Sequence, residues 1–186
     1  NINLRENPVE AKKFIGFLPQ RPPLYPDMTV EEYLIYCANL RLMEPMEIGK
    51  AVECAMARCG VTHFRSRLLR NLSGGYQQRI GIAQAIVHPQ FVVLDEPTNG
   101  LDPNQIVEIR NLIKELATDH AVMLSTHILP EVQATCDEIR MIEHGKVVFS
   151  GSMDDFDNYV APTSFTATLA NAPSIEELGK LKGVTS

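Results

Sequence analysis

The apolar residues of this chain follow two spacings, and each spacing predicts a different kind of element. Short uninterrupted apolar runs predict strands at 14–18, 91–94 and 121–124, and the second run is typical of a central parallel strand covered on both faces. Apolar residues three or four positions apart predict helices between these runs. A strand–helix order with buried strands is typical of an α/β protein with a parallel sheet.

Capping residues mark where the predicted helices begin. Thr29 with Glu32 is a capping-box sequence, and Asp102 followed by Pro103 is typical of a helix start. Ser73 opens a further helix. The residues expected to face the core are Val30, Leu34, Cys37 and Leu40 in the helix from Thr29; Ile48, Val52, Met56 and Cys59 in a helix from Pro45 to Cys59; Ile80, Ala83 and Val87 after Ser73; and Ile106, Ile109, Ile113 and Leu116 after Asp102.

The remaining elements outline the domain organisation. A proline-rich loop at 20–28 and two successive helices predict a helical subdomain at 21–71. The runs 139–143 and 146–149 flank His144-Gly145 and predict a hairpin, and Ser152 with Asp155 predicts a short helix. From about Pro162 the pattern changes. Further predictions there are a strand at 164–169, a helix at 174–181 and, at 161–186, the start of a C-terminal accessory segment.

Composition narrows the class of function. The net charge of −6 disfavours a protein that binds nucleic acid by neutralising its phosphates. The four cysteines form no Cys-x-x-Cys pair, so we expect reduced thiols. No apolar run approaches the roughly 20 residues that span a bilayer, so we expect any membrane association to come through a partner.

Polar residues with candidate chemistry follow directly on two predicted strands. Asp95 and Glu96 follow the second strand, and His127 lies just beyond the third. Ligands of parallel sheets bind at the carboxyl ends of the strands. Adjacent acids there can divide two tasks of nucleotide hydrolysis, holding Mg²⁺ and polarising the attacking water. Ser73-Gly74-Gly75 at a helix start is suited to binding an anion.

Each of these features also has a plainer explanation when it is taken alone. The two acids could be solvated groups at a strand end, and the Ser-Gly-Gly turn could be an ordinary helix cap. His127 could be structural, Gln20 could be a polar loop residue, and Asp102 could only cap its helix.

Five segments in fixed order resemble the ATP-binding-cassette (ABC) ATPases. They are Phe17-Leu18-Pro19-Gln20, Leu72-Ser73-Gly74-Gly75-Tyr76, Phe91–Glu96, Gly100-Leu101-Asp102 and Ser125-Thr126-His127. The resemblance implies a P-loop NTPase (RecA-like) core at 1–20 and 72–160 with the helical subdomain inserted at 21–71. It implies ATP and Mg²⁺ as ligands. The similarity is greatest to ABC-2-type exporters of the gliding-motility and multidrug groups.

The resemblance also implies a role for each candidate residue. Asp95 and Gln20 would lie in the coordination shell of the metal ion. Three residues would take part in hydrolysis: Glu96 as base, His127 as switch residue, and Gln20. Ser73, Gly74 and Gly75 form the signature segment, which contacts the ATP of a second subunit in a head-to-tail dimer. Asp102 belongs to the loop that crosses that dimer interface. Tyr76 departs from the family, whose commonest residue there is Gln.

One expected motif is missing from the sequence. No Gly-x-x-x-x-Gly-Lys-Ser/Thr phosphate loop (Walker A) occurs in the 186 residues. In the family this loop precedes the strand that ends near Gln20. We therefore expect a fragment or partly observed chain with an incomplete N-terminal part, inactive by itself. A naturally degenerate module is the alternative.

The resemblance implies a function and a location as well. The complete protein is expected to be the ATP-hydrolysing subunit of a membrane exporter, with an ABC-2-type permease and a second ATP-binding subunit as partners and no nucleic acid. It would be cytoplasmic, on the inner face of the plasma membrane through its permease. The alternatives are a soluble ABC ATPase acting on ribosomes or nucleic acid, and a non-catalytic cassette that lends its signature to a partner.

Overall fold

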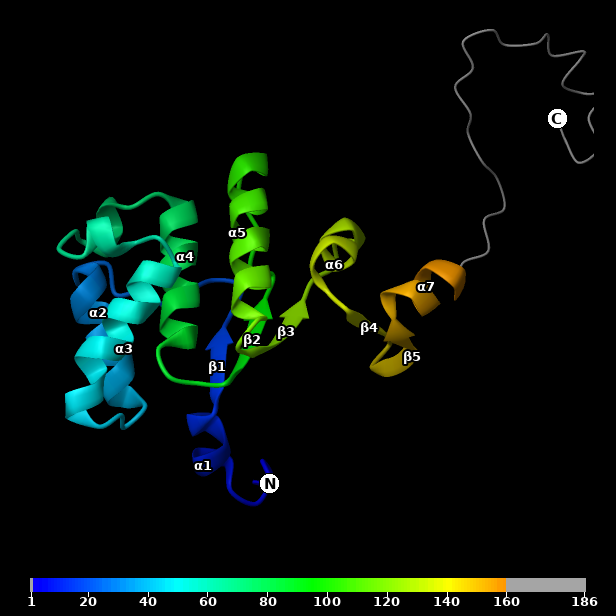
Figure 1. Cartoon of the computed structure of the whole chain (residues 1–186), viewed down its shortest axis with the longest axis horizontal. Helices are drawn as coiled ribbons and strands as arrows, with labels where there is room; N and C mark the ends of the chain where they lie inside the picture. The colour runs from blue at the N-terminus through cyan, green and yellow to red at the C-terminus, as the bar shows by residue number, and fades with distance from the viewer. Residues whose placement is uncertain (1, 160–186) are drawn as a thin grey trace, which may run out of the picture.

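The computed structural model describes residues 2–159, which form two sheets and the helices around them (Figure 1). The accessory segment predicted at 161–186, with its strand and helix, lies outside the described residues. The helices are α1 (Pro8–Lys13), α2 (Val30–Leu40), α3 (Pro45–Arg58), α4 (Gly74–Ile86), α5 (Pro103–Leu116), α6 (Leu129–Thr135) and α7 (Met153–Tyr159), with short 3₁₀ turns at Thr62–Phe64 and Leu69–Asn71.

A three-stranded parallel sheet forms the centre of the molecule, in agreement with the predicted α/β class. Its order is β1 (Ile15–Leu18), β2 (Phe91–Asp95) and β3 (Ala121–Ser125), so β2 is central as predicted. The strands are in close register: Leu18 pairs with Leu94, and Leu94 pairs with Leu124. All three strands therefore end at the same edge of the sheet.

One face of this sheet is buried under α4 and α5. The buried side chains of both helices share one hydrophobic cluster with Leu18, Val92 and Leu94. The opposite face is only partly buried by residues 2–159. Its row of register partners runs from Phe17 through Val93 to Met123, and Phe17 and Met123 are each 50% exposed.

The prediction that the strand at 91–94 is covered on both faces was therefore wrong for the described residues. Burial alternates along β2, and Ala121, Met123 and Ser125 of β3 are exposed. The reason is that Val122 and Leu124 of β3 face the same core as Val92 and Leu94, whereas the alternate residues lie on the opposite face of the sheet. An apolar run alone does not distinguish a strand with one covered face from a strand with two.

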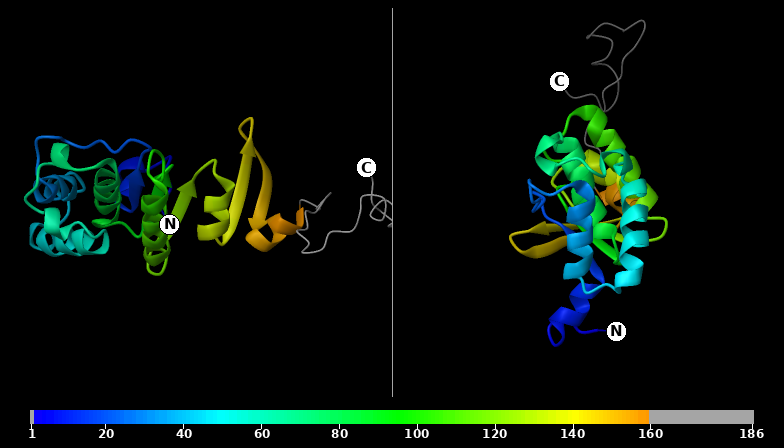
Figure 2. Two further views of the ribbon diagram at one scale, coloured as in Figure 1. Left: turned by 90° about the horizontal axis from the view of Figure 1, so that it is seen from above. Right: turned by 90° about the vertical axis from the view of Figure 1, so that its left-hand side faces the viewer.

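The helices α2 and α3 pack together on the far side of α4 (Figures 1 and 2). Both fall within the range 21–71. The capping box between Thr29 and Glu32 is present, and the four residues predicted to be buried in helix 45–59 are buried. Leu40 was predicted wrongly, because it is 65% exposed. It lies two residues beyond buried Ala38, about 200° around the helix, and so points away from the core.

Helix α4 approaches β1 unusually closely. A Cβ atom built on Gly16 would lie 1.9 Å from the backbone oxygen of Ala85 in α4. The side chain of Gln84 donates a hydrogen bond of 2.7 Å to the carbonyl of Phe17, and Arg41 donates one of 3.0 Å to the carbonyl of Ile15. These bonds satisfy carbonyl groups on the edge of β1 that faces away from β2.

Beyond β3, the chain forms a small antiparallel unit at the end of the molecule (Figure 2). Strands β4 (Glu138–Glu143) and β5 (Lys146–Ser152) form the predicted hairpin, with positive φ angles at His144 (48°) and Gly145 (76°). Ser152 and Asp155 cap α7 through mutual hydrogen bonds, as predicted. No helix among residues 2–159 combines the length and the apolar composition that crossing a membrane requires.

Candidate active site

The sheet register brings most of the predicted site residues to one edge. Because Leu18, Leu94 and Leu124 are aligned, Gln20, Glu96 and Thr126 each stand two residues beyond the same level of the sheet. His127 follows Thr126 directly. The site is therefore built from the segments that follow three neighbouring parallel strands, where such sheets bind ligands.

Glu96 and His127 are in direct contact. The Oε1 atom of Glu96 lies 2.7 Å from the Nδ1 atom of His127 and also accepts a 3.1 Å hydrogen bond from the backbone N–H of His127. The side chain of Glu96 is only 15% exposed, whereas that of His127 is 78% exposed. The imidazole is thus held at its inner nitrogen by the carboxylate while the rest of the ring faces outward.

This contact changes the protonation of His127. Its hydrogen bond to Glu96, followed by the negative charge of Glu96, raises the pKa of the imidazole above its ordinary value. Partial desolvation opposes the shift but is smaller. The pair therefore places an imidazole with a raised pKa, which can carry a positive charge, beside a carboxylate.

The backbone at Glu96 adopts a conformation that is rare for a residue other than glycine. Its φ angle is +46°, and its N–H donates a 2.8 Å hydrogen bond to the carbonyl of Ser125. The chain turns sharply at this point, directly after β2. The turn directs the Glu96 side chain toward the segment after β3, and no sequence signal indicated it.

A buried carboxylate that sequence reasoning did not assign to the site lies behind this pair. Glu131 in α6 is 2% exposed, and its two carboxylate oxygens each lie 2.7 Å from the hydroxyl of Thr98. The hydroxyl of Thr126 lies 3.4 Å from Glu131 and 3.3 Å from Glu96. Arg110 of α5 supplies a positive charge 3.8 Å from Glu131. An acid in a short surface helix normally faces solvent, so the sequence pattern gave no sign of this burial.

Asp95 and Gln20 remain available to a ligand. Neither side chain makes a hydrogen bond or an ion pair within residues 2–159. No cluster of three or more potential metal-binding side chains occurs in the described part of the chain. A carboxylate and an amide oxygen at the ends of neighbouring strands fit Mg²⁺, which is usually held by one or two carboxylates together with phosphate oxygens and water rather than by a complete set of protein ligands.

The signature turn, Ser73-Gly74-Gly75, has the features of an anion-binding helix start. Ser73 precedes α4 but its side chain makes no capping hydrogen bond, so its hydroxyl is free. A Cβ atom on Gly74 would meet nothing within 4 Å, so this side of the turn is open. The first N–H groups of a helix have no partner within the helix, and here they point toward the exposed end at Ser73.

Gly75 has a different environment from Gly74. A Cβ atom at Gly75 would lie 2.7 Å from the side chain of Gln105 in α5, so the glycine allows the starts of α4 and α5 to approach each other.

Asp102 caps α5 by accepting hydrogen bonds of 3.0 Å from the N–H groups of Asn104 and Gln105. A cavity of about 240 Å³ lies between the two helix starts and is lined by Gly75, Tyr76, Asp102 and Gln105 among others.

The structure thus separates the predicted residues into two groups. Glu96 and His127 touch at the strand ends, with Asp95 and Gln20 on the neighbouring positions. Ser73, Gly74, Gly75 and Asp102 lie at the starts of α4 and α5. Within residues 2–159, no hydrogen bond or ion pair joins the two groups.

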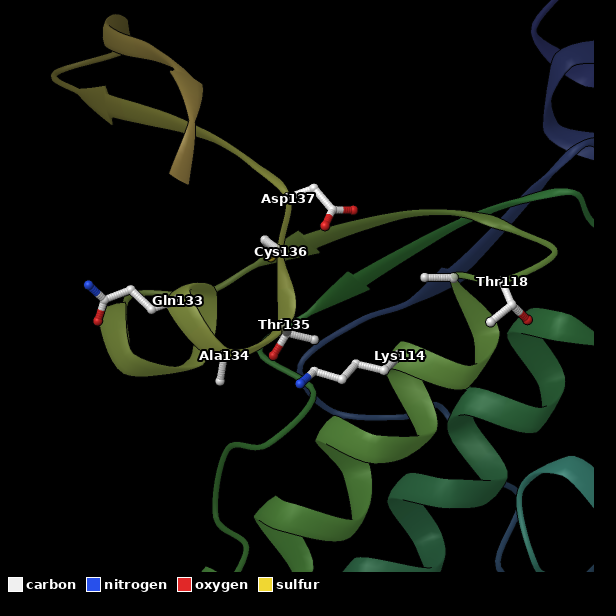
Figure 3. Close-up of a pocket in the computed structure, with 8 residues that line it drawn as sticks. Lys114, Thr118, Gln133, Ala134, Thr135, Cys136 and Asp137 are labelled. Atoms are coloured by element: carbon white, nitrogen blue, oxygen red, sulfur yellow. The ribbon is translucent and has the colours of Figure 1, made fainter. Parts of the chain in front are cut away.

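A second cavity, of about 390 Å³, lies between the end of α5 and α6. Figure 3 shows Lys114 extending from α5 toward Ala134 and Thr135 at the end of α6, and Gln133, Cys136 and Asp137 also line the cavity. None of the predicted site residues lines this cavity.

Known proteins are similar in sequence to segments that carry residues from both groups of predicted site residues. A family model described as ABC transporter matches residues 2–99, more than half of the 186-residue chain. The chain belongs to the ABC transporter ATP-binding family. The match includes the signature turn and the Asp95-Glu96 pair of this ABC chain.

Individual relatives agree with the family assignment. The chain is 34% identical over 152 residues to the ABC transporter ATP-binding protein NatA of Bacillus subtilis, covering 80% of this chain and 62% of NatA. It is also 34% identical over 149 residues to the bacitracin transport ATP-binding protein BcrA of Bacillus licheniformis, covering 78% of this chain and 48% of BcrA. The ABC chain therefore spans between about half and two thirds of these relatives.

A solved structure supports the P-loop NTPase fold class. The fold is similar to that of cbiO1 from Clostridium perfringens, described as part of the ABC transporter complex cbiONQ, with a TM-score of 0.74 and 28% sequence identity. The likeness covers 83% of this ABC chain and 63% of cbiO1.

Proposed function

We propose that the complete protein containing this ABC chain is the ATP-hydrolysing subunit of a membrane exporter. The observation that carries the proposal is the contact between Glu96 and His127 at the ends of two parallel strands, beside the unengaged carboxylate of Asp95. A charged imidazole, a general base and a metal-binding carboxylate are among the groups that can serve phosphoryl transfer to water.

In this proposal Glu96 is the general base. Its Oε1 atom is occupied by His127, whereas Oε2 accepts only one long hydrogen bond, from Thr126 at 3.3 Å. A carboxylate oxygen can accept two hydrogen bonds, so Oε2 retains a site for a water molecule. Glu96 would orient that water and accept its proton as the oxygen attacks the terminal phosphoryl group.

His127 is proposed to bind the terminal phosphate. The raised pKa keeps its ring charged over more of the neutral range, and the exposed part of the ring would donate a hydrogen bond to a phosphate oxygen. Asp95 and Gln20 would hold Mg²⁺, which neutralises charge on the phosphates when bound. Ser73, Gly74 and Gly75 would contact ATP held by a second subunit, and Asp102 would lie at that subunit interface.

The transport role rests on the relatives. BcrA is described as a bacitracin transport protein and LnrL of Bacillus subtilis as a linearmycin resistance protein, and both are described as ATP-binding proteins. We infer an ABC-2-type permease as partner, a head-to-tail dimer of ATP-binding subunits, and a cytoplasmic location at the inner face of the plasma membrane.

The test of catalysis is Glu96→Gln in the intact protein. The amide cannot accept a proton, so we expect the rate of phosphate release from ATP to fall by roughly 10²- to 10⁴-fold. The affinity for ATP, measured by equilibrium binding, should remain close to that of the parent protein. Glu143→Gln, at an exposed position of the β4–β5 hairpin, is the matched control and should leave turnover unchanged.

Two results would contradict the proposal. Unchanged turnover in Glu96→Gln would remove the role of Glu96 as base. An intact protein that binds ATP but releases no phosphate would instead favour the non-catalytic cassette.

A further inference from the structure

The environment of Glu131 is unusual for an acidic residue. Its side chain is almost completely inaccessible to water, and a buried carboxylate is costly unless hydrogen bonds and an opposite charge compensate for the lost hydration. Thr98 and Arg110 provide that compensation. These partners come from two different parts of the chain: Thr98 from the loop after β2 and Arg110 from α5.

Thr98 connects Glu131 to the general base proposed above. Thr98 is two residues beyond Glu96 and is itself only 3% exposed. Its hydroxyl, 2.7 Å from both carboxylate oxygens, is buried together with them. Because Glu96 begins a turn at a positive φ angle, the position of the following residues decides where its side chain points.

Thr126 provides a second connection. Its hydroxyl accepts a 3.2 Å hydrogen bond from the N–H of Ile128, and its single proton faces two carboxylates, at 3.3 Å from Glu96 and 3.4 Å from Glu131. The loop after β3, which carries His127, is thereby placed between the two acids. Glu131 thus contacts both of the loops whose side chains form the Glu96–His127 pair.

We propose that Glu131 is a positioning residue that holds the loops after β2 and β3 together, through Thr98 and Thr126, so that Glu96 faces His127. It would not touch ATP or water. The proposal rests on the proposed role of Glu96 only for its consequence on turnover, because the positioning of Glu96 against His127 can be measured without nucleotide.

A purely structural role for Glu131 makes a different prediction. If Glu131 only stabilised the fold, variants that remain folded would keep the Glu96–His127 contact. If Glu131 positions the pair, folded variants should lose the effect of Glu96 on His127. The pKa of His127, followed by NMR of the imidazole and assigned with His127→Gln, reports that effect.

Thr98→Val is the sharper of two variants. Valine has nearly the shape of threonine but no hydroxyl, and it leaves the charge of Glu131 and its pairing with Arg110 in place. We expect the pKa of His127 to fall toward its ordinary value. We also expect kcat for ATP hydrolysis to fall on the order of 10- to 100-fold, with KM nearly unchanged, because a misplaced base slows the reaction without altering binding.

Glu131→Ala removes the proposed positioning residue itself and should change both measurements in the same direction. Part of its effect on His127 would come from the lost charge alone, because Glu131 also contributes to the raised pKa. Glu138→Ala, an exposed acid just beyond α6, controls for the loss of a nearby charge and should leave kcat unchanged.

The outcomes are distinguishable. If Glu131→Ala does not fold, the positioning role of Glu131 is tested by Thr98→Val alone. A folded Thr98→Val protein with unchanged His127 pKa and unchanged kcat overturns the proposal, as does a rise in KM with no change in the pKa. If the parent protein hydrolyses no ATP, the proposed function fails, and the His127 titration still tests the positioning.

Discussion

The close approach of α4 to β1 gives a prediction whose size can be worked from the structure. In Gly16→Ala, the new methyl group would lie 1.9 Å from the oxygen of Ala85, whereas ordinary contacts begin at 3.4 Å. Helix α4 would have to move by the difference, 3.4 − 1.9 = 1.5 Å, because the contacted atom belongs to the backbone and has no other conformation available.

That movement has two costs. Overpacking a well-filled core typically costs about 1–3 kcal/mol, and a backbone displacement of this size belongs at the upper end. The hydrogen bond from Gln84 to the carbonyl of Phe17 would also be lost or stretched, which costs about 1 kcal/mol. Gly16→Ala should therefore lower the free energy of unfolding by about 4 kcal/mol.

Gly49→Ala is the matched control. Gly49 lies inside α3, is exposed, and a Cβ atom there would meet nothing within 4 Å. The same substitution should raise the free energy of unfolding by about 1 kcal/mol, because alanine favours the helix more than glycine does. Urea denaturation of the intact protein at 25 °C, followed by circular dichroism, measures both changes. If Gly16→Ala unfolded within about 0.5 kcal/mol of the parent protein, helix α4 would not be seated on β1 as described.

Two further predictions concern ionisable groups. Because Glu96 raises the pKa of His127 in the folded protein, their contact should stabilise the fold fully below about pH 6.5, as long as Glu96 is ionised, and the stabilisation should fade as the pH rises through the raised pKa. The difference in Tm between the parent and His127→Gln should follow that course, and a difference that grew above pH 8 would contradict it. Burial raises the pKa of Cys59 to about 12, whereas Cys54 is exposed, so a thiol reagent should modify Cys54 at once and Cys59 only on unfolding. Cys54→Ser should remove the fast phase, and rapid labelling of Cys59 in the folded protein would count against its burial.

Features that depend on neighbouring residues were predictable from the sequence. The caps at Thr29, Asp102 and Ser152 all form with partners within three positions, so the sequence contains the whole interaction. The turn at His144-Gly145 is equally local. The order of strands and helices followed from apolar spacing for the same reason.

Burial depends on what lies opposite, and there the sequence was less informative. The run 121–124 is as apolar as the run 91–94, yet Met123 is half exposed, because its side chain lies on the face of the sheet opposite to the core. Leu40 continues an apolar spacing but points away from the core, about 200° around the helix from buried Ala38. Periodicity identifies a face but does not say how far a neighbour extends over it.

In the candidate site, too, local features could be predicted from the sequence and features that depend on tertiary packing could not. That Glu96 and His127 both follow strands could be predicted from pattern, because parallel strands end at a common edge. Their 2.7 Å contact, the positive φ angle at Glu96 and the burial of Glu131 could not be predicted, because all three depend on tertiary packing. The roles of these residues in catalysis stay predictions.

The alignment of Leu18, Leu94 and Leu124 across the sheet restricts how this protein can vary in length. A one-residue insertion inside β1, β2 or β3 would turn every following side chain of that strand to the other face and shift one group of the site relative to the rest. Insertions in the helical stretch between β1 and α4 leave that alignment intact. Tolerated insertions and deletions, in natural variants or in a designed library, should therefore concentrate far from the few residues that precede Gln20, Asp95 and Thr126.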